Sequence, residues 1–222
     1  MKITINRHIL VAFLVVLLAV FNSLILLKVT NKEALFVDEY MKGHLQPLQG
    51  EGSLAFFSVI TEMGSEVGIV ATVMASLLWM GRKKMYAAMA VYPLAIISTH
   101  IVNKTLKEIV ARERPSLNEA LDALGYSFPS GHAMLSVVTY GFLACMIAGS
   151  QIGKTVKVLA AFISALLIIL VGLSRVVLSV HYPSDVLGGY AMGGILLVAA
   201  LYAYTYAQGL QQHKQEMARK RA

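Results

Sequence analysis

Long apolar segments without charge constrain this chain more than any other feature of its sequence. Residues Ile9–Leu27 form one such segment directly behind Lys2 and Arg7. A helix needs about 20 predominantly apolar residues to cross the hydrocarbon core of a bilayer, so this segment is long enough to do so. No A-x-A-like cleavage site follows it. We therefore expect a retained first transmembrane span rather than a signal peptide.

Five further segments have the length and composition of membrane spans. We place them at about 59–80, 85–102, 132–148, 158–173 and 186–207. The chain is 57% hydrophobic and only 14% charged, whereas soluble domains carry about 25% charged residues. These features predict an all-α fold, an integral membrane bundle of six transmembrane helices. We expect residues 1–222 to form a single domain, because the length leaves no room for a separate soluble one.

The polar stretch between the first two spans contains a segment suited to the membrane surface. Leu35, Phe36 and Tyr40 have helix-like spacing beside Asp38 and Glu39. This pattern is typical of an amphipathic helix lying in the interface. We therefore predict an amphipathic and loop region on the outer side of the bundle, over the polar loops that emerge there.

The distribution of basic residues predicts the orientation of the bundle. Six spans place both termini on one side, and cytoplasmic loops carry an excess of Lys and Arg. The side with the termini would collect Lys2, Arg7, Arg82, Lys83, Lys84, Lys154, Lys157, Lys214, Arg219, Lys220 and Arg221. We therefore expect a multi-pass protein of the cell membrane with cytoplasmic termini. The loop 103–128, the start of the span at 132 and the stretch 174–185 would then all emerge on the extracytoplasmic side.

Charge and cysteine content exclude several classes of function. The formal net charge is +7, but in so apolar a chain basic residues mark cytoplasmic loops and contact anionic lipid, so we do not expect nucleic-acid binding. Cys145 is the only cysteine in the sequence. It therefore cannot form an intrachain disulfide or a cysteine-based metal site. A cysteine phosphatase loop would place an arginine six positions later, where this chain has Gln151.

The first of three polar clusters is Lys107–Pro115. Lys107 and Arg114 are seven residues apart, so on one helix they would share a face. Pro115 should end that helix at Arg114, and a capping box beginning at Ser116 would open a short second helix. Taken alone, this cluster is an ordinary basic helix end that faces lipid headgroups.

The second cluster, Pro129–His132, stands directly before a predicted span. Ser130 and Gly131 would lie at the helix start, where free backbone N–H groups and the helix dipole favour an anion. His132 can titrate near neutral pH. Taken alone, the cluster is equally compatible with a turn and an N-cap.

The third cluster is Ser174–Asp185, between the last two predicted spans. Pro183 fits the first position of a helix, which makes Asp185 its third residue and leaves His181 just before it. Asp185 can then reach back towards His181 and fix its tautomer. In isolation, Asp185 could equally be a first-turn acid, and Arg175 a C-terminal cation of the preceding span.

Together the three clusters indicate a phosphate pocket with a nucleophile and an acid. Phosphoryl transfer requires neutralised equatorial oxygens, an in-line attacker and a proton for the leaving oxygen. The sequence shows no carboxylate cluster suited to Mg²⁺ or Zn²⁺. We therefore expect cationic side chains to replace a metal, with no cofactor.

The spacing within these clusters resembles the three-part signature of the type 2 phosphatidic acid phosphatase superfamily. The matching residues are Lys107-x6-Arg114-Pro115, Pro129-Ser130-Gly131-His132 and Ser174-Arg175-x5-His181-x3-Asp185. No block departs from the pattern. Within the superfamily, the chain is most similar to the bacterial phosphatidylglycerophosphate phosphatase B type.

This resemblance implies a role for each matching residue. His181 would attack the phosphorus and form a phosphohistidine, Asp185 would orient it, and His132 would protonate the departing lipid oxygen. The phosphoryl oxygens would be bound by Lys107, Arg114, Ser130, Gly131 and Arg175. The resemblance also implies catalysis without a metal.

Several alternatives remain open from the sequence. The substrate would be a membrane phospholipid such as phosphatidylglycerophosphate, or a prenyl diphosphate such as undecaprenyl diphosphate. The sequence does not separate them, because the motif residues would bind the phosphate and not the lipid tail. A transporter or anion-binding protein would need ionisable residues near span centres, whereas here they stand at span ends. Six apolar spans argue against a soluble phosphatase or a vanadium haloperoxidase. The sequence identifies no protein partner.

Overall fold

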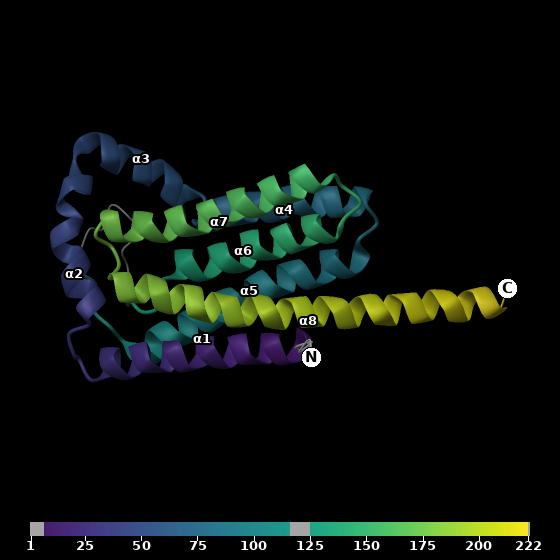
Figure 1. The fold of residues 1–222 in the computed structure, drawn as a ribbon, viewed down its shortest axis with the longest axis horizontal. Helices are drawn as coiled ribbons and strands as arrows, with labels where there is room; N and C mark the ends of the chain where they lie inside the picture. The colour runs from purple at the N-terminus through teal and green to yellow at the C-terminus, as the bar shows by residue number, and fades with distance from the viewer. Residues whose placement is uncertain (1–6, 116–124, 222) are drawn as a thin grey trace, which may run out of the picture.

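The computed structural model describes residues 7–115 and 125–221, and within these ranges every regular element is helical (Figure 1). In chain order the elements are α1 (Arg7–Thr30), α2 (Phe36–His44), the short 3₁₀ helix η1 (Gln46–Gln49), α3 (Glu51–Glu62), α4 (Glu66–Arg82), α5 (Tyr86–Val110), α6 (Gly131–Gly149), α7 (Lys154–Val177) and α8 (Pro183–Arg221). The predicted all-α class is confirmed.

Five helices in the described ranges are long and apolar enough to cross a membrane, namely α1, α5, α6, α7 and α8. Helices α3 and α4 meet the same criterion only as a pair, bent by 48° at the break between them. The structure therefore divides the second predicted span, 59–80, between two helices. It extends the third span from residue 102 to Val110, and the sixth to a helix of 39 residues.

The break between α3 and α4 has a local cause at Gly64 and Ser65. The Ser65 hydroxyl accepts from the Gly68 N–H at 3.2 Å, so Ser65 caps α4, and it also donates to the Glu62 carbonyl at 2.9 Å. A Cβ on Gly64 would collide with the Val171 side chain and lie 3.1 Å from the His132 ring. The bend thus brings the backbone at Gly64 directly against His132.

The spanning helices lie side by side, and α6 packs against α5, α7 and α8. Helix α2 crosses one end of this bundle (Figure 1). The first turns of α6 and α8 and the last turns of α1, α5 and α7 lie at that same end (Figure 1). We call it the site end, because it gathers the three polar clusters of the sequence.

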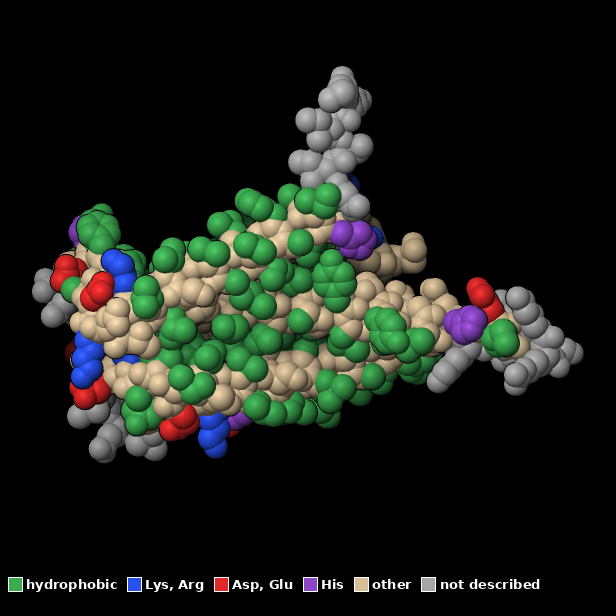
Figure 2. Space-filling model, turned by 90° about the horizontal axis from the view of Figure 1, so that it is seen from below, with side chains coloured by type: hydrophobic (Ala, Val, Ile, Leu, Met, Phe, Trp, Pro, Cys, Tyr) green, Lys and Arg blue, Asp and Glu red, His purple; other side chains and the backbone are tan. Residues whose placement is uncertain are grey.

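Hydrophobic side chains cover the flanks of the bundle, and charged side chains lie towards its ends (Figure 2). Phe13 in α1 and Phe162 in α7 are 65% and 64% exposed. Exposed apolar surface of this extent is costly in water but suits contact with lipid tails. Beneath the site end, buried residues form a core that includes Leu45, Phe57, Ala133, Val177 and Val186.

The end of α5 differs from the sequence prediction. The helix stops at Val110, and Ala111 adopts a left-handed conformation with φ of 49° while its N–H donates to the Lys107 carbonyl at 2.9 Å. The prediction that Lys107 and Arg114 share a face of one helix is therefore wrong. The chain leaves the helix before Pro115, and the residues after Ala111 turn towards charged partners on other elements. The predicted helix opening at Ser116 lies outside the described residues.

Candidate active site

The three sequence clusters meet at the site end. His181 lies in the turn between α7 and α8, and its Nε2 is 3.3 Å from Nη1 of Arg114, which follows α5. His132, in the first turn of α6, lies near enough to His181, Lys107, Arg114 and Arg175 for their charges to act on it. The fold therefore brings the two histidines and the three predicted cations together.

The predicted contact between Asp185 and His181 is present. Asp185 is the third residue of α8, and its Oδ2 lies 3.4 Å from Nδ1 of His181. The same oxygen accepts from the Tyr182 N–H at 2.8 Å and from the Ser127 hydroxyl at 2.5 Å. A proton on Nδ1 of His181 directed at Asp185 leaves a lone pair on Nε2. That nitrogen then carries the free lone pair, and it faces Arg114.

His181 is neutral at physiological pH in this environment. Its side chain is buried, and burial is the main cause that lowers its pKa from 6.5 to about 4. The carboxylate of Asp185 raises this pKa, while Arg114 and Arg175 lower it. Since protonation would block the lone pair, a depressed pKa keeps the imidazole available for attack.

The predicted phosphate-binding cations are placed by contacts with the backbone and with a neighbouring helix. Arg175, in the last turn of α7, is 3% exposed and donates from Nη1 to the Thr61 hydroxyl at 2.7 Å. Arg114 donates to the carbonyl of Gly125 at 3.0 Å and to that of Val180 at 2.7 Å. Lys107 lies half-buried in the last turn of α5. Arg114 and Arg175 lie near enough to His181 for their charges to act on it, and Lys107 lies near enough to Arg114, Arg175 and Asp185 to interact with theirs.

The start of α6 is fixed between α5 and α8. The buried Ser130 accepts from the Ala133 N–H at 3.4 Å, and its own N–H donates to the Asp185 carbonyl at 3.0 Å. A Cβ on Gly131 would lie only 2.9 Å from Oδ1 of Asn103, so the start of α6 packs closely against this side chain of α5. Asn103 in turn donates to the Pro129 carbonyl at 3.0 Å. The N-terminus of α6 therefore has a defined position next to His132.

Sequence reasoning missed several residues that build this site. Arg112 donates to Oδ2 of Asp38 and to the Ser184 hydroxyl, both at 2.8 Å. Arg112 also donates to Oδ1 of Asp185 at 2.5 Å. Thr61 and Ser127 contact Arg175 and Asp185 as described above. Sequence spacing gave no signal for these pairs, because their members stand on separate elements far apart in the chain.

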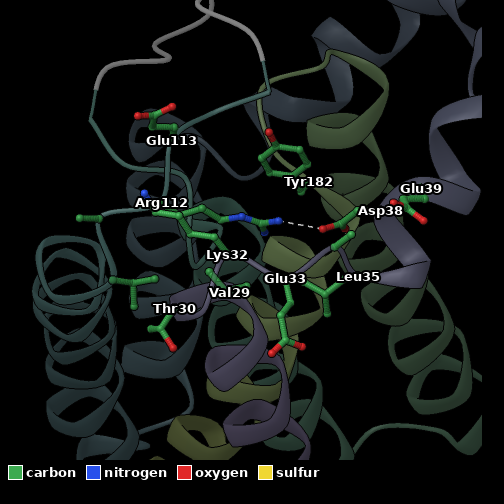
Figure 3. A pocket seen from close by; sticks show the side chains of 13 residues that line it. Val29, Thr30, Lys32, Glu33, Leu35, Asp38, Glu39, Arg112, Glu113 and Tyr182 are labelled. Atoms are coloured by element: carbon green, nitrogen blue, oxygen red, sulfur yellow. Dashed lines mark hydrogen bonds and ion pairs between the residues drawn. The ribbon is translucent and has the colours of Figure 1, made fainter.

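A polar pocket of about 450 Å³ lies next to these side chains, between the end of α1, the start of α2, residues 110–113 and Tyr182 (Figure 3). None of the eight predicted site residues lines it. Arg112 and Tyr182 border both the pocket and the histidine cluster, and the Arg112 guanidinium lies 4.1 Å from the centre of the Tyr182 ring. The pocket is therefore a neighbour of the candidate active site and not the phosphate position itself.

The electrostatic character of the site suits an anion. Residues 7–115 and 125–221 contain no group of three or more His, Cys, Asp or Glu side chains placed to bind a metal ion. The groups that act on His181 include Asp185 but also the cations Arg114 and Arg175. Such a set of donors can bind phosphoryl oxygens and neutralise the charge that develops on them.

Comparison with known proteins identifies the family. A model described as the PAP2 superfamily matches residues 88–209, which make up more than half of the chain and include all eight predicted site residues. The chain belongs to the PAP2 superfamily. This confirms the family predicted from the sequence, and the chain is accordingly a multi-pass membrane protein.

Two known proteins illustrate the similarity. Phosphatidylglycerophosphatase B of Bacillus subtilis (strain 168) is 38% identical over 101 residues, which cover 43% of this chain and 48% of that protein. The chain thus matches about half the length of this curated relative. The fold is also similar to the crystal structure of the first transmembrane PAP2 type phosphatidylglycerolphosphate phosphatase from Bacillus subtilis. The TM-score is 0.70 at 23% identity, with 87% of this chain and 96% of that chain covered.

Proposed function

We propose that this protein is a metal-independent membrane lipid phosphatase that hydrolyses a phosphate monoester such as phosphatidylglycerophosphate. One observation carries the proposal: His181 is buried, with Nδ1 near Asp185 and Nε2 facing Arg114. A nucleophile directed into a group of cations is what phosphoryl transfer requires. The name of the curated relative from Bacillus subtilis supports the same reaction class.

In the first chemical step, Nε2 of His181 attacks the phosphorus. The N–P bond forms, the P–O bond to the lipid breaks, and His132 gives its proton to the departing oxygen. In the second step, water attacks the phosphohistidine and His132 accepts its proton. The N–P bond breaks, inorganic phosphate leaves, and both histidines return to their starting states.

The phosphoryl oxygens are bound by Lys107, Arg114 and Arg175, together with Ser130 and the N–H of Gly131. The first N–H groups of α6 have no partner within their own helix, and the helix dipole adds positive potential there. Positive charge from three elements around one phosphoryl group stabilises the charge that builds up in the transition state.

The location of the site suits a lipid substrate. Every predicted site residue lies at the site end of the bundle, so a headgroup can enter there while its tails remain in the bilayer. We assign this end to the extracytoplasmic face of the cell membrane and both termini to the cytoplasm, because exposed basic residues such as Arg82, Lys83 and Lys84 lie at the other end.

A substrate panel measured in EDTA tests the proposal. Detergent-solubilised protein is compared on phosphatidylglycerophosphate, phosphatidic acid, undecaprenyl diphosphate and a soluble phosphomonoester, ranked by kcat/KM. We expect phosphate release in EDTA, inhibition by vanadate, and the highest value for phosphatidylglycerophosphate. A higher kcat/KM for undecaprenyl diphosphate would assign that lipid as the substrate in place of phosphatidylglycerophosphate. No phosphate release from any of the four compounds would contradict the proposed activity and favour an anion-binding or transport role.

A further inference from the structure

Arg112 stands two residues before Arg114 and binds a carboxylate on each side. Its Nη1 donates to Oδ1 of Asp185 at 2.5 Å, and its Nη2 donates to Oδ2 of Asp38 at 2.8 Å. The side chains of Arg112 and Asp38 are only 16% and 10% exposed, and that of Asp185 is fully buried. One guanidinium therefore connects helix α2 with the first turn of α8.

We propose that Arg112 is a positioning residue for the pair of Asp185 and His181, and that Asp38 of α2 fixes Arg112 in place. The inference rests on the proposed function, in which His181 is the nucleophile. Arg112 occupies one of the unspecified positions of the first motif, and Asp38 lies outside all three motifs. Arg112 acts through Asp185, which is the residue that contacts His181.

The two oxygens of Asp185 have different partners, and this explains why Arg112 matters. Oδ2 accepts from Ser127 and from the Tyr182 N–H, and it is the oxygen near His181. Oδ1 accepts from Arg112. Fixing both oxygens prevents rotation of the carboxylate, so the imidazole keeps the orientation that directs Nε2 at the substrate.

Asp38 connects this arrangement to the membrane surface. Its Oδ1 accepts from the Ser184 N–H at 2.8 Å, and its Oδ2 accepts from the Ser184 hydroxyl at 2.7 Å as well as from Arg112. On the same short helix, Phe36 and Tyr40 are 78% and 53% exposed and their rings are stacked. Helix α2 thus carries aromatic side chains suited to the interface. It also carries Asp38, whose carboxylate binds Arg112 (Figure 3) and reaches Ser184 in the first turn of α8. Correct docking of α2 and correct geometry of the catalytic pair are therefore coupled.

The network also has an electrostatic consequence at His181. The charged and titratable groups around the pair come from every neighbouring element: Asp38 from α2, Lys107 from α5, Arg112 and Arg114 from the segment after it, His132 from α6, Arg175 from α7 and Asp185 from α8. Removing the charge of Arg112 leaves Asp185 less neutralised, so His181 becomes easier to protonate. Removing the charge of Asp38 acts in the opposite direction.

Profiles of kcat and kcat/KM against pH for four variants and one matched control test this inference. For Arg112→Gln we expect kcat to fall about 100-fold with little change in KM. The acid limb of its profile, the pH range in which kcat/KM falls as His181 is protonated, should move up by about one pH unit. Arg112→Lys keeps the charge but loses the two-sided geometry, so its kcat should fall while its acid limb stays in place. Asp38→Asn should lower kcat without raising the acid limb, and Asp38→Asn combined with Arg112→Gln should be no worse than Arg112→Gln alone. Glu113→Gln, at the exposed neighbour of Arg112, is the matched control and should behave as wild type.

Two results would overturn the inference. One is an Arg112→Gln profile that matches Glu113→Gln. The other is a loss confined to KM with the acid limb unmoved, which would make Arg112 a direct substrate ligand. Thermal unfolding in detergent shows whether each variant folds, and if Arg112→Gln does not, Arg112→Lys and Asp38→Asn decide the question by the same criteria.

Titration of His181 by NMR in detergent micelles measures the same coupling without turnover. A higher midpoint in Arg112→Gln than in wild type supports the network, and an equal midpoint contradicts it. An inactive wild type with the expected titration would therefore refute the proposed function and leave the network standing.

Discussion

The two ends of the bundle both carry charged residues but place them in opposite surroundings. At the site end, the ion pairs Arg112–Asp38 and Arg112–Asp185 and the contact between His181 and Asp185 are largely or fully buried. At the other end, Arg82, Lys83 and Lys84 are exposed, and Arg82 donates to the carbonyl of Leu78 in its own helix. Burying charge costs several kcal/mol per ion unless partners compensate, whereas exposed charge costs little. The buried set is therefore where function is expected, and the exposed set serves orientation in the membrane.

Of the substitutions at the two ends, replacement of His181, the proposed nucleophile, should cause the largest loss of phosphatase activity. In His181→Ala we expect phosphate release to fall at least about 10⁴-fold, since loss of a nucleophile disables the whole catalytic unit. The fold should survive, because alanine leaves no unpaired charge. Phosphate release and thermal unfolding in detergent are the measurements, and substantial residual activity in the folded variant would remove His181 from its assigned role.

A smaller but still large loss is expected from Asp185→Asn. The single amide NH2 of asparagine can face only one side: towards His181 it favours the wrong tautomer of the imidazole, and towards Arg112 it meets another donor. In either orientation the guanidinium loses the charge of one counter-ion. We expect kcat at pH 7 to fall about 10³- to 10⁴-fold. A loss below tenfold would show that Asp185 does not orient the nucleophile.

Acid should inactivate the enzyme only at low pH. The pKa of His181 is lowered to about 4, chiefly by burial, so the imidazole is neutral above that pH and becomes protonated below it. kcat/KM, which reports on the free enzyme, should fall as pH decreases through about 4, tenfold for each further unit. Half-loss of activity already near pH 6.5 would mean that His181 is not shielded from water as the structure has it.

The smallest effect is expected at the opposite end. Lys83→Gln combined with Lys84→Gln removes two exposed charges that contact none of the site residues. We expect kcat and KM to stay within about twofold of wild type, because exposed charges at this distance are screened. Purified protein in detergent is the appropriate sample, since orientation in the membrane then plays no part. A tenfold loss would show that the two ends are coupled.

The sequence predicted the parts of this structure that depend on local spacing. The contact between His181 and Asp185 follows from their separation of four residues and from Pro183 at the start of α8. The apolar segments likewise predicted the all-helical membrane bundle, since span length follows directly from bilayer thickness.

The parts it missed depend on contacts between distant residues. Arg112 and Asp38 are 74 positions apart, and neither belongs to a pattern that periodicity can detect. Ala111 ends α5 before Pro115 because the segment after it turns towards Asp185 and His181, which tertiary contacts decide and helix propensity does not. The close approach of His132 in α6 to Gly64 likewise joins segments that are far apart in the chain.

Trapping the covalent intermediate tests the central claim most directly. Protein reacted briefly with phosphatidylglycerophosphate labelled in its terminal phosphate is quenched in alkaline denaturant, in which an N–P bond to histidine survives, and the labelled peptide is identified by mass spectrometry. The mechanism predicts label on His181 in wild type and none in His181→Ala. Rapid turnover by wild type with no labelled histidine, or label on a different residue, would contradict it.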